Sequence, residues 1–409
     1  MTERTTCRIC DSPDLEVFLK LGDLPHSDGL IRPEDLDKPE PRYPLDVAFC
    51  RECSLVQILK TVPPEELFGD DYPYFSSFSD ALLEHSRKNV EAIIAQRNVS
   101  SDQLVIELAS NDGYLLQFYQ KQGIPVLGID PAAGPVKAAR EKGIETIHDF
   151  FTLDLAKRLA AEGRSAHVIH GNNVLAHVAD TNGFVQGIAT LLHPDGVAVI
   201  ECPYVRDLID HCEFDTIYHE HLCYFSVTAL VELFRRNGLH LNDVAPLAIH
   251  GGSLRLFVEK ADRPSERLKK ILVDERECGL TQIDYYRDFS DRVVDVKVKL
   301  NELLRGFKAE GKTIVGYGAA AKGAILLNYA GIGTDVLEFV ADRNVHKQGR
   351  LMPGVHVPIV DPAEILESQP DVVLILPWNF KDEIMKQQAE YRARGGKFVV
   401  PIPTPEVVG

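Results

Sequence analysis

A chain of 409 residues is too long for one ordinary hydrophobic core, so its length predicts two or three domains. The composition is 45% hydrophobic and 26% charged, with no apolar run of membrane-span length and no signal peptide at the N-terminus. The formal net charge of −17 argues against nucleic acid as the main partner, because phosphate backbones are bound by clustered Lys and Arg. We therefore expect a cytoplasmic, enzyme-like protein with no membrane or nucleic-acid partner.

Two cysteine pairs distinguish the N-terminal segment, which we assign to residues 1–75. Cys7 and Cys10 form one CxxC pair, and Cys50 and Cys53 form the second. Two thiolates two residues apart can hold one side of a tetrahedral ion, and the second pair closes the shell. A closed four-sulfur site has no open position, so the pattern predicts a structural zinc module. The alternative, four unlinked thiols, is disfavoured by the paired spacing.

Strands and helices alternate through the next segment, which we assign to residues 76–245. The pattern predicts a helix over 80–96, strands over 104–108, 125–130, 167–170 and 196–201, and helices beginning near Tyr114 and ending near Lys142. Such alternation is typical of a parallel, doubly wound sheet with helices on both faces.

The loop after the first of these strands, in the sequence VIELASNDG, suits an adenosine-bearing cofactor. A dinucleotide site needs G-x-G-x-x-G to seat a pyrophosphate, whereas Ala109 and Asn111 stand at glycine positions here and only Gly113 remains. S-adenosylmethionine has no phosphate, so this loop favours it over NAD. We therefore predict that the chain binds S-adenosylmethionine and uses it as a methyl donor.

Further cofactor residues are predicted at the ends of the following strands. Asp130 ends the next strand, 23 residues after Glu107, where a carboxylate can accept both ribose hydroxyls. Asp149 to Phe151 would place a polar group and a ring beside the adenine. The predicted cofactor set is Glu107, Ala109, Asn111, Gly113, Tyr114, Leu115, Asp130, Pro131, Asp149, Phe150, Phe151, Asn172 and Asn173. Taken singly, each of these is more often a turn or core residue.

The sequence YHEH, residues 218–221, is the densest cluster of titratable groups in the chain. Histidine is the side chain best suited to removing a proton near neutral pH, and Glu220 can orient and stabilise it. A metal site is the weaker interpretation, because the triplet is not HExxH and neighbours on a strand point to opposite faces. His177 follows the fourth strand, where a lone histidine is as often structural as catalytic.

The sequence HGGSLR, residues 250–255, joins a loop to a strand. Its paired glycines and Ser253 would hold an oxyanion or a phosphate, with Arg255 nearby. The alternative is a tight turn before an edge strand.

A second α/β pattern follows a helical stretch at 264–309, and we assign residues 246–409 to a C-terminal domain. Strands are predicted over 313–316, 337–342, 372–376 and 397–400, with a helix over 319–329. The sequence GYGAAAKG places Lys322 at a helix start, which favours anion binding. A basic loop runs from Arg343 to Arg350. A pyrophosphate-bearing ligand explains both features, and the alternative is a Rossmann-like domain with a solvated basic loop.

In this order, the CxxC pairs, ELASNDG, YHEHLCYFS, HGGSLR and GYGAAAKG resemble one family over essentially the whole chain. It is the sugar C-methyltransferases that act on nucleotide-linked 4-keto-deoxysugars of branched-sugar antibiotic pathways. The resemblance implies an enzyme with structural zinc, S-adenosylmethionine in the middle domain, and a dTDP-linked sugar held largely by the C-terminal domain.

The resemblance also implies roles for individual residues. His221 would remove the C3 proton next to the C4 ketone, with Tyr218, Glu220, Tyr72 and His177 around the reacting sugar. The diphosphate would meet Lys322, Arg343 and Lys347. The full predicted substrate set is Tyr218, His250, Ser253, Arg255, Tyr317, Lys322, Arg343, His346 and Lys347.

Two other functions compete with this interpretation. One is an NAD-linked nucleotide-sugar oxidoreductase that uses the C-terminal Gly-x-Gly, against which the missing third glycine counts. The other is a zinc-ribbon methyltransferase acting on RNA or protein, which the net charge of −17 opposes for RNA. The sequence does not fix the oligomeric state, and a monomer is compatible with it.

Overall fold

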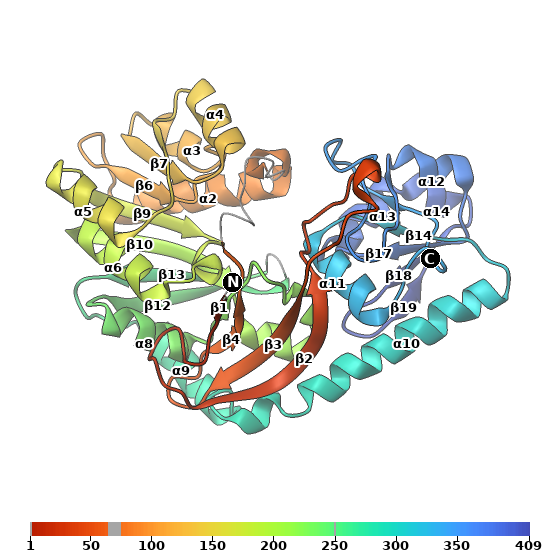
Figure 1. The fold of residues 1–409 in the computed structure, drawn as a ribbon. Coiled ribbons are helices and arrows are strands. Elements are labelled where there is room, and N and C mark those ends of the chain that lie inside the picture. The colour runs from red at the N-terminus through yellow and green to blue at the C-terminus, as the bar shows by residue number, and fades with distance from the viewer. Residues whose placement is uncertain (1, 64–74, 249–250) are drawn as a thin grey trace.

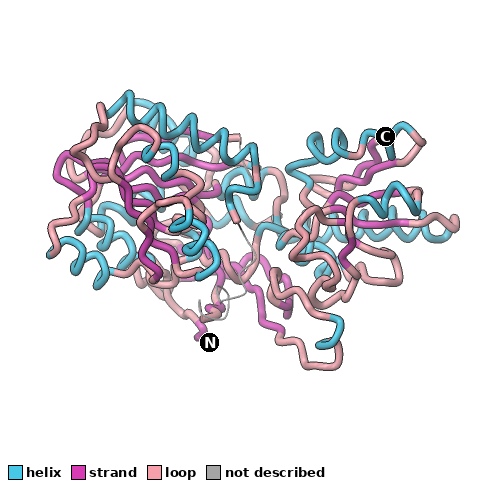
Figure 2. Tube along the Cα trace, turned by 90° about the horizontal axis from the view of Figure 1, so that it is seen from above, coloured by secondary structure: helices cyan, strands magenta, loops and turns pink. Residues whose placement is uncertain are grey.

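Two α/β bodies are joined by a pair of long strands and one long helix (Figure 1). The structure, a computed structural model, describes residues 2–63, 75–248 and 251–409. In a view from above, the two bodies lie side by side with the N-terminal strands reaching between them (Figure 2). Among the described residues, no helix combines the length and apolar character that a membrane crossing requires.

The N-terminal module is an antiparallel sheet in the order β11-β4-β3-β2. It consists of β2 (Leu15–Pro25), β3 (Arg42–Cys50), β4 (Val56–Ile58) and β11 (Cys223–Tyr224). A short pair, β1 (Thr2–Glu3) with β5 (Lys60–Thr61), lies beside it. Because β11 comes from the middle of the chain, this sheet ties the module to the second domain.

The middle domain is built on a seven-stranded sheet in the order β12-β13-β10-β9-β6-β7-β8. Its strands are β6 (Val105–Leu108), β7 (Val126–Asp130), β8 (Thr146–His148), β9 (Ala166–Asn172), β10 (Leu192–Pro203), β12 (His240–Leu247) and β13 (Ser253–Glu259). Five neighbouring strands of this sheet run parallel, in the order β10-β9-β6-β7-β8, which confirms the predicted doubly wound fold. The alternative interpretation of HGGSLR was a tight turn before an edge strand. Strand β13 pairs with both β10 and β12, so the strand after this sequence is not at the edge of the sheet. The domain boundary predicted at 245 falls inside β12, which pairs with β13.

Helices cover both faces of this sheet. Buried residues of α2 (Asp80–Arg97), α3 (Leu116–Gln120) and α4 (Ala133–Glu141) form one core, and those of α5 (Leu153–Ala161), α6 (Thr181–Leu191) and α8 (Val227–Arg236) pack on the other face. Polar N-caps start several of these helices; Ser79, for example, accepts the amide of Leu82 at the start of α2. Helix α7 (Val205–Asp210) follows β10.

The C-terminal body follows α9 (Glu266–Glu277) and α10 (Phe289–Ala309), which runs beneath it in Figure 1. Its sheet has the order β16-β15-β14-β17-β18-β19. The strands are β14 (Ile314–Tyr317), β15 (Val340–Ala341), β16 (Ile359–Val360), β17 (Val372–Ile375), β18 (Lys397–Val400) and β19 (Glu406–Val408), and the helices are α11 (Ala321–Ala330), α12 (Ala363–Ser368), α13 (Lys381–Gln387) and α14 (Ala389–Ala393). The second α/β pattern is thus confirmed, although the strand predicted over 337–342 is shorter.

Candidate functional site

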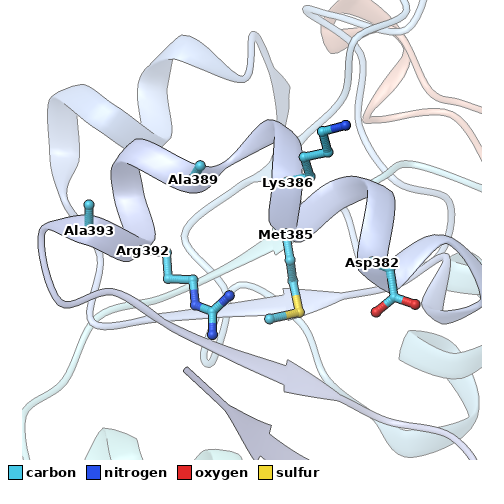
Figure 3. A pocket seen from close by; sticks show the side chains of 6 residues that line it. All are labelled: Asp382, Met385, Lys386, Ala389, Arg392 and Ala393. Carbon is cyan, nitrogen blue, oxygen red and sulfur yellow. The ribbon is translucent and has the colours of Figure 1, made fainter.

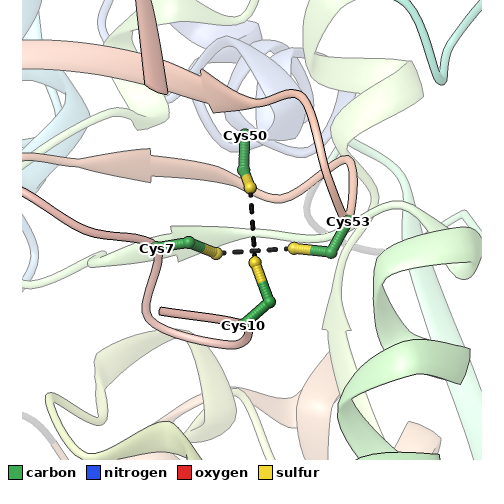
Figure 4. A group of neighbouring side chains, drawn as sticks. All are labelled: Cys7, Cys10, Cys50 and Cys53. Atoms are coloured by element: carbon green, nitrogen blue, oxygen red, sulfur yellow. Dashed lines mark hydrogen bonds between the residues drawn. The ribbon is translucent and has the colours of Figure 1, made fainter. Parts of the chain in front are cut away.

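Four cysteines meet at the end of the N-terminal module. Their sulfur atoms all lie within 4.8 Å of one another, with Cys7 Sγ 3.4 Å from Cys53 Sγ and Cys10 Sγ 3.6 Å from Cys50 Sγ. Figure 4 shows the four side chains converging on one centre. Tetrahedral zinc with four thiolates has sulfur atoms about 3.8 Å apart, so the cluster fits that ion. Four protein ligands fill the coordination shell, which makes the site structural.

The cofactor loop after β6 is held in an unusual backbone conformation. Ala109, Asn111 and Gly113 have φ angles of 55°, 48° and 76°, in the left-handed region that favours glycine. A Cβ on Gly113 would lie 2.4 Å from Ile144 Cδ1, so the end of the Ile144 side chain would have to shift to admit it. The loop therefore keeps the backbone path of a glycine-rich turn although two of its residues carry side chains.

Three carboxylates surround this loop. Asp130 at the end of β7 accepts the amides of Asn111 and Ala132, both at 2.8 Å. Burial raises the pKa of Glu107 well above its usual range, and the nearby Asp130 and Asp112 add to the shift. Carboxyl groups at this loop offer acceptors for the hydroxyls of a ribose. This set of acceptors fits the adenosyl group of S-adenosylmethionine.

A short segment before α2 docks on the same loop. The amide of Ser76 donates to Asn111 Oδ1 at 2.9 Å, and the hydroxyl of Ser77 donates to Asp112. Lys142 Nζ reaches Asp112 Oδ2 at 3.0 Å from the end of α4. These contacts were not predicted, because the serines precede the loop by 35 residues and carry no motif of their own.

The other predicted cofactor residues are distributed between the site and the core. Tyr114 and Leu115 are buried in the core under α2 and α3. Phe151 packs edge-on against Phe184, at 5.3 Å between ring centroids, whereas Asp149 is exposed. Asn172 is buried at the end of β9, and Asn173 next to it has a φ angle of 52°. Pro131 follows Asp130 and offers its carbonyl to His148 at 2.9 Å.

An aromatic and histidine cluster forms where the sequence YHEH turns. The amide of His221 donates to the carbonyl of Tyr218 at 2.9 Å, so the segment is a turn and not the strand on which the two-face argument relied. The ring of His221 lies 4.0 Å from that of Tyr218 and 4.6 Å from that of His177, between centroids. His221 Nδ1 is 2.9 Å from the carbonyl of Thr216. That oxygen can only accept, so the neutral ring carries its proton on Nδ1 and its lone pair on Nε2.

Burial controls the protonation of the neighbouring groups. It lowers the pKa of His177 to about 4, with partial opposition from the backbone of Glu220, and this keeps the ring neutral at physiological pH. Burial raises the pKa of Glu220 to about 7, and Asp28 contributes further. The predicted catalytic residue Tyr72 lies outside the described residues, as does the predicted substrate residue His250.

The HGGSLR segment faces acidic side chains of the middle domain. A Cβ on Gly251 would lie 2.6 Å from Glu213 Oε2, and one on Gly252 would lie 2.1 Å from Asp207 Oδ2. Ser253 is buried at the start of β13. Arg255 Nε donates to Glu201 Oε1 at 2.7 Å, so its charge is already balanced within the protein.

Lys322 at the start of α11 contacts residues of its own body and lies near two carboxyl groups of the middle domain. Its Nζ donates to Asn379 Oδ1 at 2.9 Å and lies 4.6 Å from the ring centre of Trp378. Trp378 Nε1 in turn donates to Asp215 Oδ2 at 2.8 Å. Burial raises the pKa of Glu213 to about 8 and that of Asp215 to about 6, although nearby Lys322 opposes both shifts. The chain's single tryptophan is the one sequence feature that could have indicated this cluster.

The other C-terminal residues lie near the same loop but differ in exposure. Lys347 Nζ donates to the carbonyl of Ala319 at 2.7 Å, while Arg343 and His346 are exposed. Tyr317 is buried, with its hydroxyl donating to Gln387 at 3.1 Å. A surface hollow of about 640 Å³ on α13 and α14, shown in Figure 3, contains none of the predicted residues. Its lining is Asp382, Met385, Lys386, Ala389, Arg392 and Ala393.

Three known families match successive parts of the chain. They are described as a putative zinc binding domain over residues 7–68, a methyltransferase domain over 83–244 and a C-methyltransferase C-terminal domain over 248–403. The C-methyltransferase NovU of Streptomyces niveus is 36% identical over 405 residues, covering 98% of this chain and 96% of that protein. The chain belongs to the C-methyltransferase family. This C-methyltransferase uses S-adenosylmethionine as its cofactor and carries a structural zinc ion, as the sequence predicted.

More distant relatives match the middle of this C-methyltransferase. The ubiquinone biosynthesis O-methyltransferase of Histophilus somni is 30% identical over 114 residues, covering 26% of this chain and 48% of that protein. Magnesium protoporphyrin IX methyltransferase of Synechocystis, solved with bound SAH, is 16% identical with a TM-score of 0.35, covering 44% of this chain and 83% of that one. The structural likeness is too weak to add to the assignment.

Proposed function

We propose that this C-methyltransferase acts on a nucleotide-linked 4-keto-deoxysugar, with dTDP as the nucleotide, and methylates C3 next to the ketone. The observation that carries the proposal is the position of His221, whose Nδ1 is tied to the carbonyl of Thr216 at 2.9 Å while its ring lies against Tyr218 and His177. That arrangement supports a base among hydrogen-bond donors. The related protein's name, C-methyltransferase, supports transfer to carbon.

Proton removal falls to His221 in this proposal. The hydrogen bond from Nδ1 to Thr216 leaves Nε2 as the basic nitrogen, and the same carbonyl stabilises the imidazolium that forms when Nε2 takes the C3 proton. The electrons of the C–H bond move into an enolate, whose oxygen needs donors. Tyr218 carries a hydroxyl that can donate, whereas the ring of His177 already interacts with the backbone of Glu220 and helps to pack His221.

The cofactor and the nucleotide are assigned to separate domains. S-adenosylmethionine supplies the electrophilic methyl group, and Asp130 with the 109–113 loop would hold it. The diphosphate is assigned to the loop before α11, where Lys347 reaches the carbonyl of Ala319 and Lys322 begins the helix, with the exposed Arg343 of the basic loop as a third cation. Lys322 would exchange its contact with Asn379 for a phosphate oxygen. A cytoplasmic location stays a prediction.

Replacing the base tests the proposal. We expect His221→Asn to lower the turnover of a dTDP-4-keto-deoxysugar at least about 100-fold, because general bases contribute roughly 10²–10⁴ in rate. S-adenosylhomocysteine binding, measured by calorimetry, should stay at the wild-type value, since the ring of His221 lies against Tyr218 and His177 and its Nδ1 against the carbonyl of Thr216. His240→Asn, on the edge strand β12, is the matched control. Wild-type turnover in His221→Asn would exclude this residue as the base.

A further inference from the structure

The chain just after β2 lies against the YHEH turn. Ser27 Oγ donates to Glu220 Oε2 at 3.1 Å, although the two residues are 193 positions apart in the sequence. Only 2% of Ser27 and 7% of Glu220 are exposed, so water does not compete for this hydrogen bond. The N-terminal module therefore supplies a direct partner to a residue of the proposed active site.

The residue before Glu220 is held from the same side. His219 is fully buried, and its Nε2 lies 3.2 Å from the carbonyl of Tyr43 on β3. The rings of Tyr43 and His26 pack at 5.7 and 5.8 Å from that of His219, between centroids. Thus the two central residues of the turn contact the module, while Tyr218 and His221 pack on each other beside His177.

We propose that Ser27 and its chain neighbour Asp28 are positioning residues, through which the N-terminal module orients the Glu220 carboxyl group of the YHEH turn. The inference rests on the proposed function in one respect, because it takes Glu220 as part of the reacting site. It assigns the zinc module a part in the reaction beyond stability.

Two opposing influences act on Glu220 from the module. The Ser27 hydroxyl stabilises the carboxylate, whereas the charge of Asp28 disfavours it. Burial is the largest effect and acts in the same direction as Asp28, so the pKa of Glu220 is raised to about 7. From the other elements, the buried phenol of Tyr224 on β11 faces Glu220, and His177 lies near its backbone. His219 and His221 flank it in sequence. Among these described neighbours, Asp28 is the one carboxylate.

A protonated Glu220 has a chemical use in the proposed reaction. With Oε2 accepting from Ser27, the second oxygen can carry the proton and donate a hydrogen bond to the developing enolate oxygen. A carboxylic acid kept neutral near pH 7 serves in this way in ketosteroid isomerase. Glu220 keeps its proton throughout, and the proton removed from carbon goes to His221.

The test measures the titration of Glu220 in the full-length protein, without any substrate. Glutamate labelled with carbon-13 at its carboxyl carbon is incorporated, and the Glu220 resonance is identified by its disappearance in Glu220→Gln. We expect Ser27→Ala to raise the titration midpoint and Asp28→Asn to lower it, each by about half a pH unit. Asp23→Asn, which changes an exposed carboxylate near the end of β2, is the matched control and should leave the midpoint unchanged.

Opposite shifts in the two variants support the inference, because general loosening of the fold would not move the midpoint in both directions. Midpoints in Ser27→Ala and Asp28→Asn equal to the wild-type value would overturn it. If Ser27→Ala does not fold, Asp28→Asn decides alone, since Asp28 is exposed. The pH profile of turnover is measured in parallel. A shifted midpoint with no effect of Glu220→Gln on turnover would refute the role of Glu220 and leave the coupling to the module intact.

Discussion

At the loop after β6, the backbone angles of single residues determine which cofactor can approach. Ala109 and Asn111 adopt left-handed φ angles of 55° and 48° that glycine would adopt without strain. An L-residue held there costs about 1 kcal/mol, which the bonds from Asn111 to Asp130 and Ser76 offset. Hydrogen bonds with neighbouring residues therefore allow a residue other than glycine to occupy a left-handed position in this loop.

Gly113 offers a prediction at this scale. Gly113→Ala should weaken S-adenosylhomocysteine binding about fivefold, because its Cβ would meet Ile144 Cδ1 at 2.4 Å and force that side chain to repack against the cofactor loop. Gly123→Ala is the matched control, since Gly123 has a similar φ angle of 73° but open space around its Cβ position. Calorimetric titration of both variants measures the difference. Equal affinities would show that the contact with Ile144 does not shape the cofactor loop.

The sequence predicted the residues of this loop but not their partners. Paired spacing was enough for the four cysteines, because two CxxC pairs have few other uses. In contrast, the contacts Ser76 to Asn111 and Ser27 to Glu220 join residues 35 and 193 positions apart and involve serines without any motif. Such contacts arise only once the elements have packed, so no local pattern predicts them.

At the scale of elements, two basic side chains that were predicted to bind an anionic ligand also contact residues of neighbouring strands and helices. Arg255 on β13 pairs with Glu201 on β10, and Lys322 on α11 reaches Asn379 and Trp378 after β17. The sequence located both cations correctly at element ends, but it did not indicate the acidic side chains that neighbouring elements bring to them. The sequence YHEH likewise forms a turn and not a strand. The turn brings the rings of Tyr218 and His221 together, whereas in a strand these two side chains would point to opposite faces.

The contact between Trp378 and Asp215 gives a prediction at the element scale. Trp378→Phe removes the N–H donor to a fully buried carboxylate but keeps an aromatic face for Lys322. We expect the free energy of unfolding to fall by about 1–3 kcal/mol, the cost of a buried acceptor left unpaired. Urea unfolding measures this loss, and Phe380→Leu, an exposed ring beside Trp378, is the control. A loss below about 0.5 kcal/mol would contradict the assigned bond.

At the scale of the whole molecule, the N-terminal module contacts both α/β bodies. Its sheet includes β11 of the middle domain, and Ile31 forms a two-hydrogen-bond bridge with Leu351 of the C-terminal body, at 2.8 and 3.0 Å. Glu40 accepts the amide of Gly354 at 3.0 Å. Each body therefore keeps a fixed relation to the module that carries the zinc cluster (Figure 1). The order of the domains could be predicted from the sequence. The contact of the module with both bodies could not, because β2 and β3 lie between the cysteine pairs and carry no motif.

The central claim is that the chain removes a proton from the carbon next to a ketone before that carbon is methylated. The most direct measurement incubates the protein with a dTDP-4-keto-deoxysugar and S-adenosylhomocysteine in deuterium oxide and follows the sugar protons by NMR. We predict exchange of the C3 proton by the wild-type protein and none above background by His221→Asn. Absence of C3 exchange with the wild-type protein, together with methylation of an oxygen when S-adenosylmethionine is supplied, would contradict the account.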